Sequence, residues 1–244
     1  MHHPSSAANV AQMAKRLARL HDNVEALNGN VVAAAALHEV WMPTARDDEL
    51  HLRMGRSYAS QALHIIRFAL RREMLLSLMR AWDETDRAQS LHPVIAALSK
   101  PDIWRALVED RVATTGRAYL DEPISKQLQL DLALVMSIYS AYRPEGAKYL
   151  VYKRLLVLRN VSLAHTQRPA SSELAREPED SEVDAFYDDT LALVSKLMSI
   201  VSATAIDYVE VADVYRHYAK YFWINARGEL TNGHPLFRSN ADAA

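Results

Sequence analysis

Hydrophobic residues recur every three or four positions along the first third of the chain, which is the spacing of an amphipathic helix. The pattern covers Ala8 to Trp41, where Asn28-Gly29-Asn30 is the expected break between two helices. Pro43 is the expected end of this helical pair. Asp47-Asp48 is typical of a helix start, and the periodic stretch that follows runs to Trp82, so we predict the longest helix of the chain there.

Shorter helices are predicted for the rest of the chain. They cover Ser90 to Ser99, Asp102 to Leu120, Ser125 to Tyr142, Ala147 to His165, Glu182 to Val209 and Ala212 to Phe222. The turn Arg143-Pro144-Glu145-Gly146 is short enough to make the two helices that it joins antiparallel neighbours. Asp121 to Pro123 is predicted to be a turn, and the polar segment Gln167 to Asp180 a mobile loop.

The composition favours helices over short strands and tight turns, since the 244 residues include only 6 glycines and 9 prolines. Half of the residues are hydrophobic, which is enough to bury a core. We therefore predict an all-α fold, a helical bundle in which residues 1–244 form a single domain. An aromatic C-terminal helix and tail are expected over 210–244.

Several function classes are excluded by residues and motifs that the sequence lacks. Without cysteine, the chain has no thiolate catalysis, disulfide or cysteine-rich zinc site. Its histidines form no metal-binding pattern, so we expect no metal and no cofactor. Met1 to Ala8 is not a signal peptide, and the apolar stretches are shorter than the roughly 20 residues of a membrane span. We expect a cytoplasmic protein that does not contact the membrane.

The net charge bears on how the chain would hold a nucleic acid. Its formal value is -2, so the molecule as a whole does not attract polyanions. A nucleic-acid partner would have to be held by a local group of basic residues. This argues against a protein that binds an extended duplex, but not against an enzyme that holds a few phosphates in a cleft.

Polar side chains interrupt an otherwise apolar helix end between Leu155 and His165. At 100° per residue, Arg159, Ser162 and His165 lie about 60° apart around the helix and form one slanting polar ridge. Asn160 lies on the flank of this ridge. Polar groups in such a position need partners, so the ridge is the candidate site of the chain.

The spacing of these residues resembles the signature of the HEPN superfamily, an arginine followed by four to six residues and a histidine. Arg159 and His165 match it, and Asn160 is the polar residue that the signature prefers directly after the arginine. The resemblance covers about residues 37–205. More narrowly, Leu75 to Asp83 followed by Ser90-Leu91-His92 is similar to the abortive-infection, phage-defence branch of that superfamily.

The resemblance implies a ribonuclease that needs no metal and cleaves RNA through attack of the ribose 2′-OH on the adjacent phosphorus. His165 would act as general acid or base, and the guanidinium of Arg159 would stabilise the negative phosphorane. Asn160 would position a phosphate or orient the histidine. Ser162 and Asp83 are expected to support the site.

The resemblance also implies a homodimer, because HEPN nucleases usually bring two motif-bearing helices together across one cleft. RNA would be the substrate, and a cognate antitoxin protein is a further expected partner. The expected biological setting is a toxin–antitoxin or phage-defence system.

Other interpretations of the same residues remain open. Arg159 and His165 could be structural, the arginine paired with Asp83 or Asp131, in a HEPN-like module that binds RNA or protein without catalysis. A third possibility is an antitoxin-like partner whose aromatic tail wraps another protein. His38-Glu39 and the aromatic residues from Tyr215 to Trp223 are expected to pack in the protein rather than bind a ligand.

Overall fold

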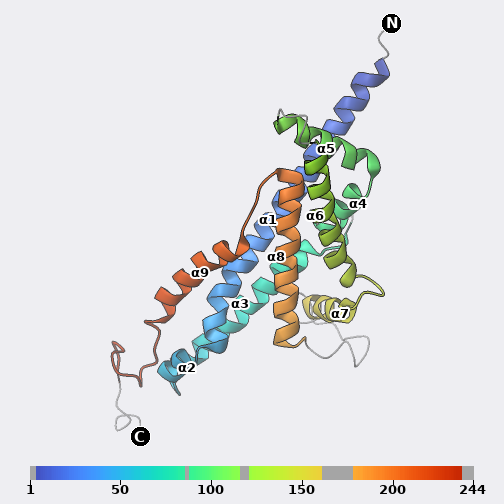
Figure 1. The fold of residues 1–244 in the computed structure, drawn as a ribbon. Helices are drawn as coiled ribbons and strands as arrows, with labels where there is room; N and C mark the ends of the chain where they lie inside the picture. Colours follow the sequence, from blue (N-terminus) through green and yellow to red (C-terminus); the bar gives the residue numbers. More distant parts are fainter. Residues whose placement is uncertain (1–3, 86–87, 116–120, 161–177, 238–244) are drawn as a thin grey trace. The chain divides into compact units, whose positions relative to one another are not determined.

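The computed structural model describes residues 4–85, 88–115, 121–160 and 178–237 (Figure 1). Within these ranges the chain forms nine α-helices and no strand, so the all-α prediction is confirmed for them. The helices are α1 (Pro4–Arg46), α2 (Asp48–Met54), α3 (Ala59–Ala81), α4 (Leu91–Leu98), α5 (Pro101–Thr115), α6 (Asp121–Ala141), α7 (Tyr149–Leu158), α8 (Asp180–Ser202) and α9 (Tyr208–Trp223). None of these described helices is both long enough and apolar enough to cross a membrane.

The helices belong to two compact units. Unit 1 consists of Met1–Val31 and Leu78–Asp207, and unit 2 consists of Val32–Ser77 and Tyr208–Ala244. Helices α4 to α8 lie wholly in unit 1, while α2 and α9 lie wholly in unit 2. Helices α1 and α3 each contribute residues to both units.

Trp82 is at the centre of an aromatic cluster in unit 1. Its ring centroid lies 5.0 Å from that of Tyr142, 5.4 Å from Phe186 and 5.7 Å from Tyr139. The indole Nε1 donates a hydrogen bond of 2.9 Å to the hydroxyl of Thr190, so its polar atom is satisfied in the core. This cluster connects the end of α3 to α6 and α8, which run side by side (Figure 1).

The turn after α6 differs from the prediction. Helix α6 packs along α8 and against α5, and α7 is turned out of line with α6 (Figure 1), so the expected antiparallel pair is wrong. The turn is closed by hydrogen bonds from the Gly146 N–H to the Arg143 carbonyl and from the Lys148 N–H to the Ala141 carbonyl. Glu145 has a φ of 72°, a left-handed conformation that redirects the chain before α7 begins.

A smaller apolar cluster forms the core of unit 2. It consists of Leu50, Met54, Leu63, Ala219 and Trp223, which come from α2, α3 and α9. Helices that are distant in the sequence therefore share this core, which packs α2 against α9.

Helix α2 begins where Asp47-Asp48 predicted a helix start, but it is shorter than the predicted helix. Asp47 caps the helix, since its carboxylate accepts a hydrogen bond of 3.0 Å from the Leu50 N–H. Gly55 then takes a φ of 52° and ends α2, so the single long helix predicted to run to Trp82 is two helices.

The longest helix is instead α1, which continues through both expected interruptions. No atom outside the helix backbone lies within 4 Å of a Cβ placed on Gly29, so this glycine fits a helix without any special role. Buried apolar residues before and after it, among them Leu27 and Val31, outweigh its weak helix propensity. Pro43 lies inside the last turn rather than at the end.

Two further boundaries differ from the prediction. Helix α6 begins at Asp121, so the segment predicted to be a turn is its first turn, where a proline is tolerated. Helix α8 ends at Ser202, where Ala203 has a φ of 55° and stops the helix before the predicted end at Val209.

Candidate functional site

Arg159 directly follows the last residue of α7, as the C-terminal cap of that helix. Its backbone N–H donates to the carbonyls of both Leu155 and Leu156, and Arg159 and Asn160 form a π-helical turn. Such widened turns interrupt the regular helical register and are frequent at functional sites. The turn therefore sets the direction in which the two polar side chains leave α7.

The structure brings three of the predicted site residues together. The Arg159 Nε donates a hydrogen bond of 3.0 Å to the Asn160 side-chain carbonyl, and its Nη1 lies 3.4 Å from the Asp83 carboxylate. The Arg159 side chain is 25% exposed and that of Asp83 31% exposed. A guanidinium has five N–H donors, so these two bonds leave others for a phosphate.

Asp83 is held in place by its neighbours. Its carboxylate accepts hydrogen bonds from the backbone N–H of Thr85, at 2.9 Å, and from the Thr85 hydroxyl. Burial raises the pKa of Asp83, but the Thr85 hydrogen bonds and the positive charge of Arg159 outweigh it and keep the pKa below its ordinary value. The carboxylate is therefore ionised at neutral pH, which suits an anchor for Arg159 better than a general acid.

A second group of charged residues borders Asp83, and sequence reasoning missed it. Glu84 pairs with Arg143 and accepts a hydrogen bond of 3.0 Å from the Tyr152 hydroxyl. Burial raises the pKa of Glu84, but the bonds from Arg143 and Tyr152 outweigh it and lower the pKa overall. Burial, followed by the nearby Glu84 charge, raises the pKa of Tyr152, which stays protonated.

The segment Ser90-Leu91-His92 also converges on this region. The Ser90 hydroxyl donates a hydrogen bond of 2.6 Å to the backbone carbonyl of Asp83. His92 Nδ1 lies 3.1 Å from the Tyr139 hydroxyl, and the Arg143 guanidinium lies over the Tyr139 ring at 5.4 Å. This segment thus helps to position Asp83, although no pattern in the sequence predicts that His92 contacts an aromatic residue of α6.

Other predictions for the site fall outside the described residues or have a second explanation. Ser162 and His165 lie outside them, as does the end of the helix predicted for Ala147 to His165. The ion pair between Arg159 and Asp83 is also what the structural interpretation of the arginine predicts. Asp131, the other expected partner, is paired with Lys196 at 3.0 Å.

The group around Arg159 consists of a cation, an amide and a carboxylate. Among the described residues, no three His, Asp or Glu side chains gather in a way that would hold a metal ion. The chemistry present is a fixed, half-buried guanidinium beside a side-chain amide. This arrangement can bind and polarise an anionic oxygen without further groups.

Comparison with known proteins identifies a family for this chain. The AbiU2 profile, a HEPN family, matches residues 17–222 and so extends beyond both ends of the resemblance seen in the sequence. No curated protein and no solved structure matches the chain. Because the match includes Asp83, Arg159 and Asn160 and spans most of the 244 residues, this protein belongs to the AbiU2 family of HEPN domains.

Proposed function

We propose that this protein is a metal-independent endoribonuclease that acts as a toxin in a toxin–antitoxin or phage-defence system. The observation that carries the proposal is the fixed group of Arg159, Asn160 and Asp83 at the end of α7, in a chain of the AbiU2 HEPN family. The sequence places His165 six residues after Arg159, as a HEPN nuclease requires. RNA is the substrate, and the protein acts in the cytoplasm.

The proposed reaction is an internal transfer at the phosphorus. The 2′-oxygen forms a bond to the phosphorus as it loses its proton, and the bond to the 5′-oxygen breaks as that oxygen gains a proton. The products are a 2′,3′-cyclic phosphate and a free 5′-hydroxyl. Arg159 stabilises the charge on the phosphorane, Asn160 contacts a phosphate oxygen, and His165 moves a proton.

Asp83 acts on the reaction through Arg159. By holding one edge of the guanidinium, it fixes the plane in which the remaining N–H donors point. A donor that is already oriented need not reorganise when charge develops on the phosphate. Ser162 is a further supporting residue in this proposal.

The reaction has two proton transfers, and one motif supplies one histidine. A homodimer that brings two α7 ends together would supply a second histidine and a second arginine. We therefore include a homodimer in the proposal, with a cognate antitoxin as the partner that restrains it.

The alternative is a HEPN domain that binds RNA or protein without cleaving RNA. The ion pair between Arg159 and Asp83 favours this alternative, because it gives the arginine a structural partner that needs no substrate. The two functions differ in the effect of changing His165, since only the nuclease needs a proton donor or acceptor there.

The experiment is cleavage of total cellular RNA and purified tRNA in excess chelator. Wild-type protein and the His64→Ala control, which removes an exposed histidine of α3, are expected to cleave. His165→Ala is expected to lose at least about 10²-fold in rate while keeping its helical circular dichroism spectrum. Equal cleavage by His165→Ala, or no cleavage by any folded protein, would favour the binding module.

A further inference from the structure

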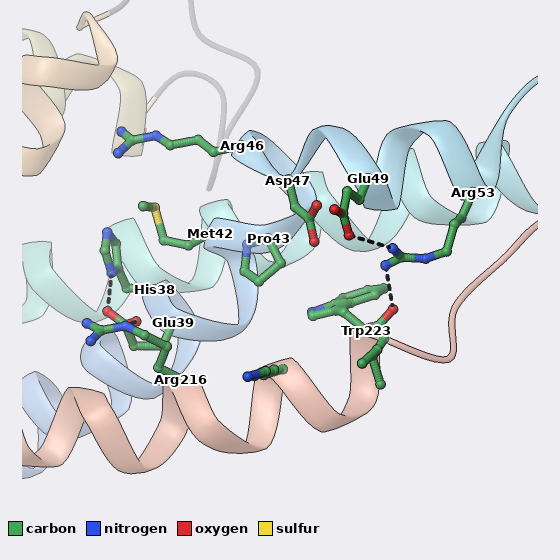
Figure 2. Close-up of a pocket in the computed structure, with 12 residues that line it drawn as sticks. His38, Glu39, Met42, Pro43, Arg46, Asp47, Glu49, Arg53, Arg216 and Trp223 are labelled. Atoms are coloured by element: carbon green, nitrogen blue, oxygen red, sulfur yellow. Dashed lines mark hydrogen bonds and ion pairs between the residues drawn. The ribbon is translucent and has the colours of Figure 1, made fainter.

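Two cavities lined by charged residues differ in whether their polar side chains already have partners. In the cavity of unit 2, Glu39 contacts both His38 and Arg216 (Figure 2). Its Trp223 is 4% exposed and belongs to the core of that unit. The polar groups of this cavity satisfy one another, so a ligand would gain little there. A cleft in unit 1 differs, since some of its polar side chains have no partner among the described residues.

The cleft in unit 1 lies between α1, α4 and the start of α5, and we call it the α1–α4 cleft. Its volume is about 420 Å³. The basic residues that line it are Arg16, Arg19, His92 and Lys100, and the described lining includes no acidic residue. The remaining lining is the amide of Asn23 and small or apolar side chains of all three helices. The cleft therefore has a positive wall beside an apolar one.

Arg19 and Lys100 bring positive charge to the cleft that no described acid neutralises. Both are exposed, and no carboxylate of the described residues lies within ion-pair distance of either. Arg16, by contrast, pairs with Asp102 at 2.6 Å. Cations that line one cleft repel each other, and an anion placed between them is attracted by both. The cleft thus favours an anionic ligand.

Asn23 is a second, independent observation that points to a ligand. It is 8% exposed and lines the cleft, and its side-chain amide makes no hydrogen bond to any residue that the structure describes. A buried amide without a partner is costly, and most buried polar groups in proteins have one. Its NH₂ group can donate two hydrogen bonds, which the oxygens of a phosphate accept. The cleft therefore combines a buried neutral donor with two cations.

The α1–α4 cleft borders the Arg159 group. Ser90 directly precedes α4, and its hydroxyl donates a hydrogen bond of 2.6 Å to the backbone carbonyl of Asp83, whose carboxylate pairs with Arg159. His92, in the first turn of α4, lines the cleft. A strand of RNA that reaches Arg159 would therefore bring further phosphates close to this cleft.

We propose that the α1–α4 cleft binds a backbone phosphate of the RNA strand whose scissile phosphate lies at Arg159. Arg19 and Lys100 pair with this phosphate, and Asn23 donates to one of its oxygens. The proposal rests on the proposed ribonuclease and gives that enzyme a second contact to its substrate. An acidic protein segment would also satisfy the cations, but it gives no reason for the cleft to border Arg159.

Fluorescence anisotropy with the full chain tests the proposal without depending on cleavage. The probe is a labelled single-stranded RNA made of 2′-O-methyl nucleotides, which keeps the phosphates but lacks the attacking hydroxyl. We expect saturable binding that weakens as the salt concentration rises, because phosphate contacts release counterions. Displacement of the probe by inorganic phosphate or by a polyglutamate peptide at the same concentration as unlabelled RNA would overturn the proposal in favour of a free anion or an acidic protein.

Two double variants show whether the binding belongs to this cleft. Arg19→Glu with Lys100→Glu is expected to weaken binding by at least about tenfold. Arg105→Glu with Lys126→Glu makes the same charge change at exposed residues of α5 and α6 in unit 1 that do not line the cleft, and it should weaken binding clearly less. All four side chains are exposed, so both proteins should fold, and circular dichroism checks this. No saturable binding by wild type, or equal binding by the two double variants, would overturn the proposal.

Asn23→Leu separates a binding role from a structural one. Because it removes a buried amide without a partner, the thermal midpoint should stay the same or rise, while binding should weaken by at least about threefold. Unchanged binding would overturn the contact assigned to Asn23.

The same proteins distinguish failure of the cleft from failure of the nuclease. Probe binding that depends on Arg19 and Lys100, in a protein that cleaves no unmodified RNA, would support the cleft and contradict the ribonuclease. Cleavage by wild type, with equal probe binding by the two double variants, would support the ribonuclease and overturn the cleft.

Discussion

Arg159 is oriented before any substrate is present. Its bonds to Asn160 and Asp83 fix the guanidinium, and Asp83 is itself fixed by Thr85. Arg159 and Asn160 were expected to be site residues because polar residues in an apolar helix end need partners, but the hydrogen bond between them was not predicted. Asp83 was included through the family resemblance, since nothing in the helical periodicity connects it with α7.

The second charged group could not be predicted in the same way. Glu84 is 59 residues from Arg143 and 68 residues from Tyr152 along the chain. Helical spacing relates residues within a few turns, whereas these contacts depend on how α6 and α7 leave the turn between them. A carboxylate next to Asp83 was visible in the sequence, but its partners were not.

Asp83→Asn tests the electrostatic part of this arrangement. Because the folded-state pKa of Asp83 is lowered, its ionisation stabilises the fold above its unfolded pKa, and this contribution is lost as the pH falls through the folded value. We expect Asp83→Asn to cost about 1 kcal/mol or less at pH 7, as is usual for a partly exposed pair. Urea unfolding at several pH values measures the free energy of unfolding of both proteins.

The difference between the two proteins should then shrink in acid. Below the ordinary carboxyl pKa of about 4, Asp83 of the unfolded chain gains a proton first. Folded wild-type Asp83 gains its proton at a lower pH and then comes to resemble the asparagine. A difference that stays constant from pH 7 down to pH 3 would show that the Asp83 charge does not stabilise this site.

Trp82→Ala tests the packing beneath the site. The substitution removes the ring that contacts Tyr142, Phe186 and Tyr139, so we expect a loss of about 3–5 kcal/mol in the free energy of unfolding. Trp104→Ala, at a half-buried tryptophan of α5, is the matched control and should cost clearly less. Equal losses in urea unfolding would contradict a central role for Trp82.

At the scale of elements, a local signal predicted the start of α2, but not which glycine ends a helix. Asp47 caps α2 as the sequence indicates, because a cap depends on local hydrogen bonds. Gly55 ends α2 and Gly29 does not end α1, although both are glycines in periodic stretches. The difference comes from tertiary packing on each side, which one sequence does not reveal.

The turn between α6 and α7 gives a test at this scale. A Cβ on Gly146 would collide with the backbone carbonyls of Ser140 and Ala141, which cannot move without disturbing the end of α6. We expect Gly146→Ala to cost about 1–3 kcal/mol in thermal or urea unfolding.

Gly29→Ala is the matched control for Gly146→Ala. A Cβ on Gly29 meets nothing within 4 Å, and alanine is the better helix former, so this change should raise the free energy of unfolding by about 0.5–1 kcal/mol. If both alanines have the same effect, close backbone approach is not what fixes the turn.

At the scale of the whole molecule, the chemistry is divided between the two units. The Arg159 group is built from unit 1, and the cavity lined by Glu39 and Arg216 from unit 2. The sequence drew attention only to the first, because its motif is short and continuous. The cavity joins Glu39 to Arg216 across 177 residues, which no local pattern indicates.

The proposed homodimer is a prediction at this scale. One chain supplies one motif, so we expect sedimentation equilibrium of the active protein to give twice the mass of a single chain. Dilution that dissociates the dimer should abolish RNA cleavage. Full activity of a monomer would show that other residues of the same chain complete the site.

The most direct measurement of the central claim is the chemistry of the RNA ends left by purified wild-type protein in excess chelator. Attack by the 2′-oxygen predicts 2′,3′-cyclic phosphate and 5′-hydroxyl ends, with Arg159→Ala leaving the RNA intact. Fragments with 5′-phosphate ends, or cleavage that requires added metal, would contradict a HEPN-type reaction at Arg159.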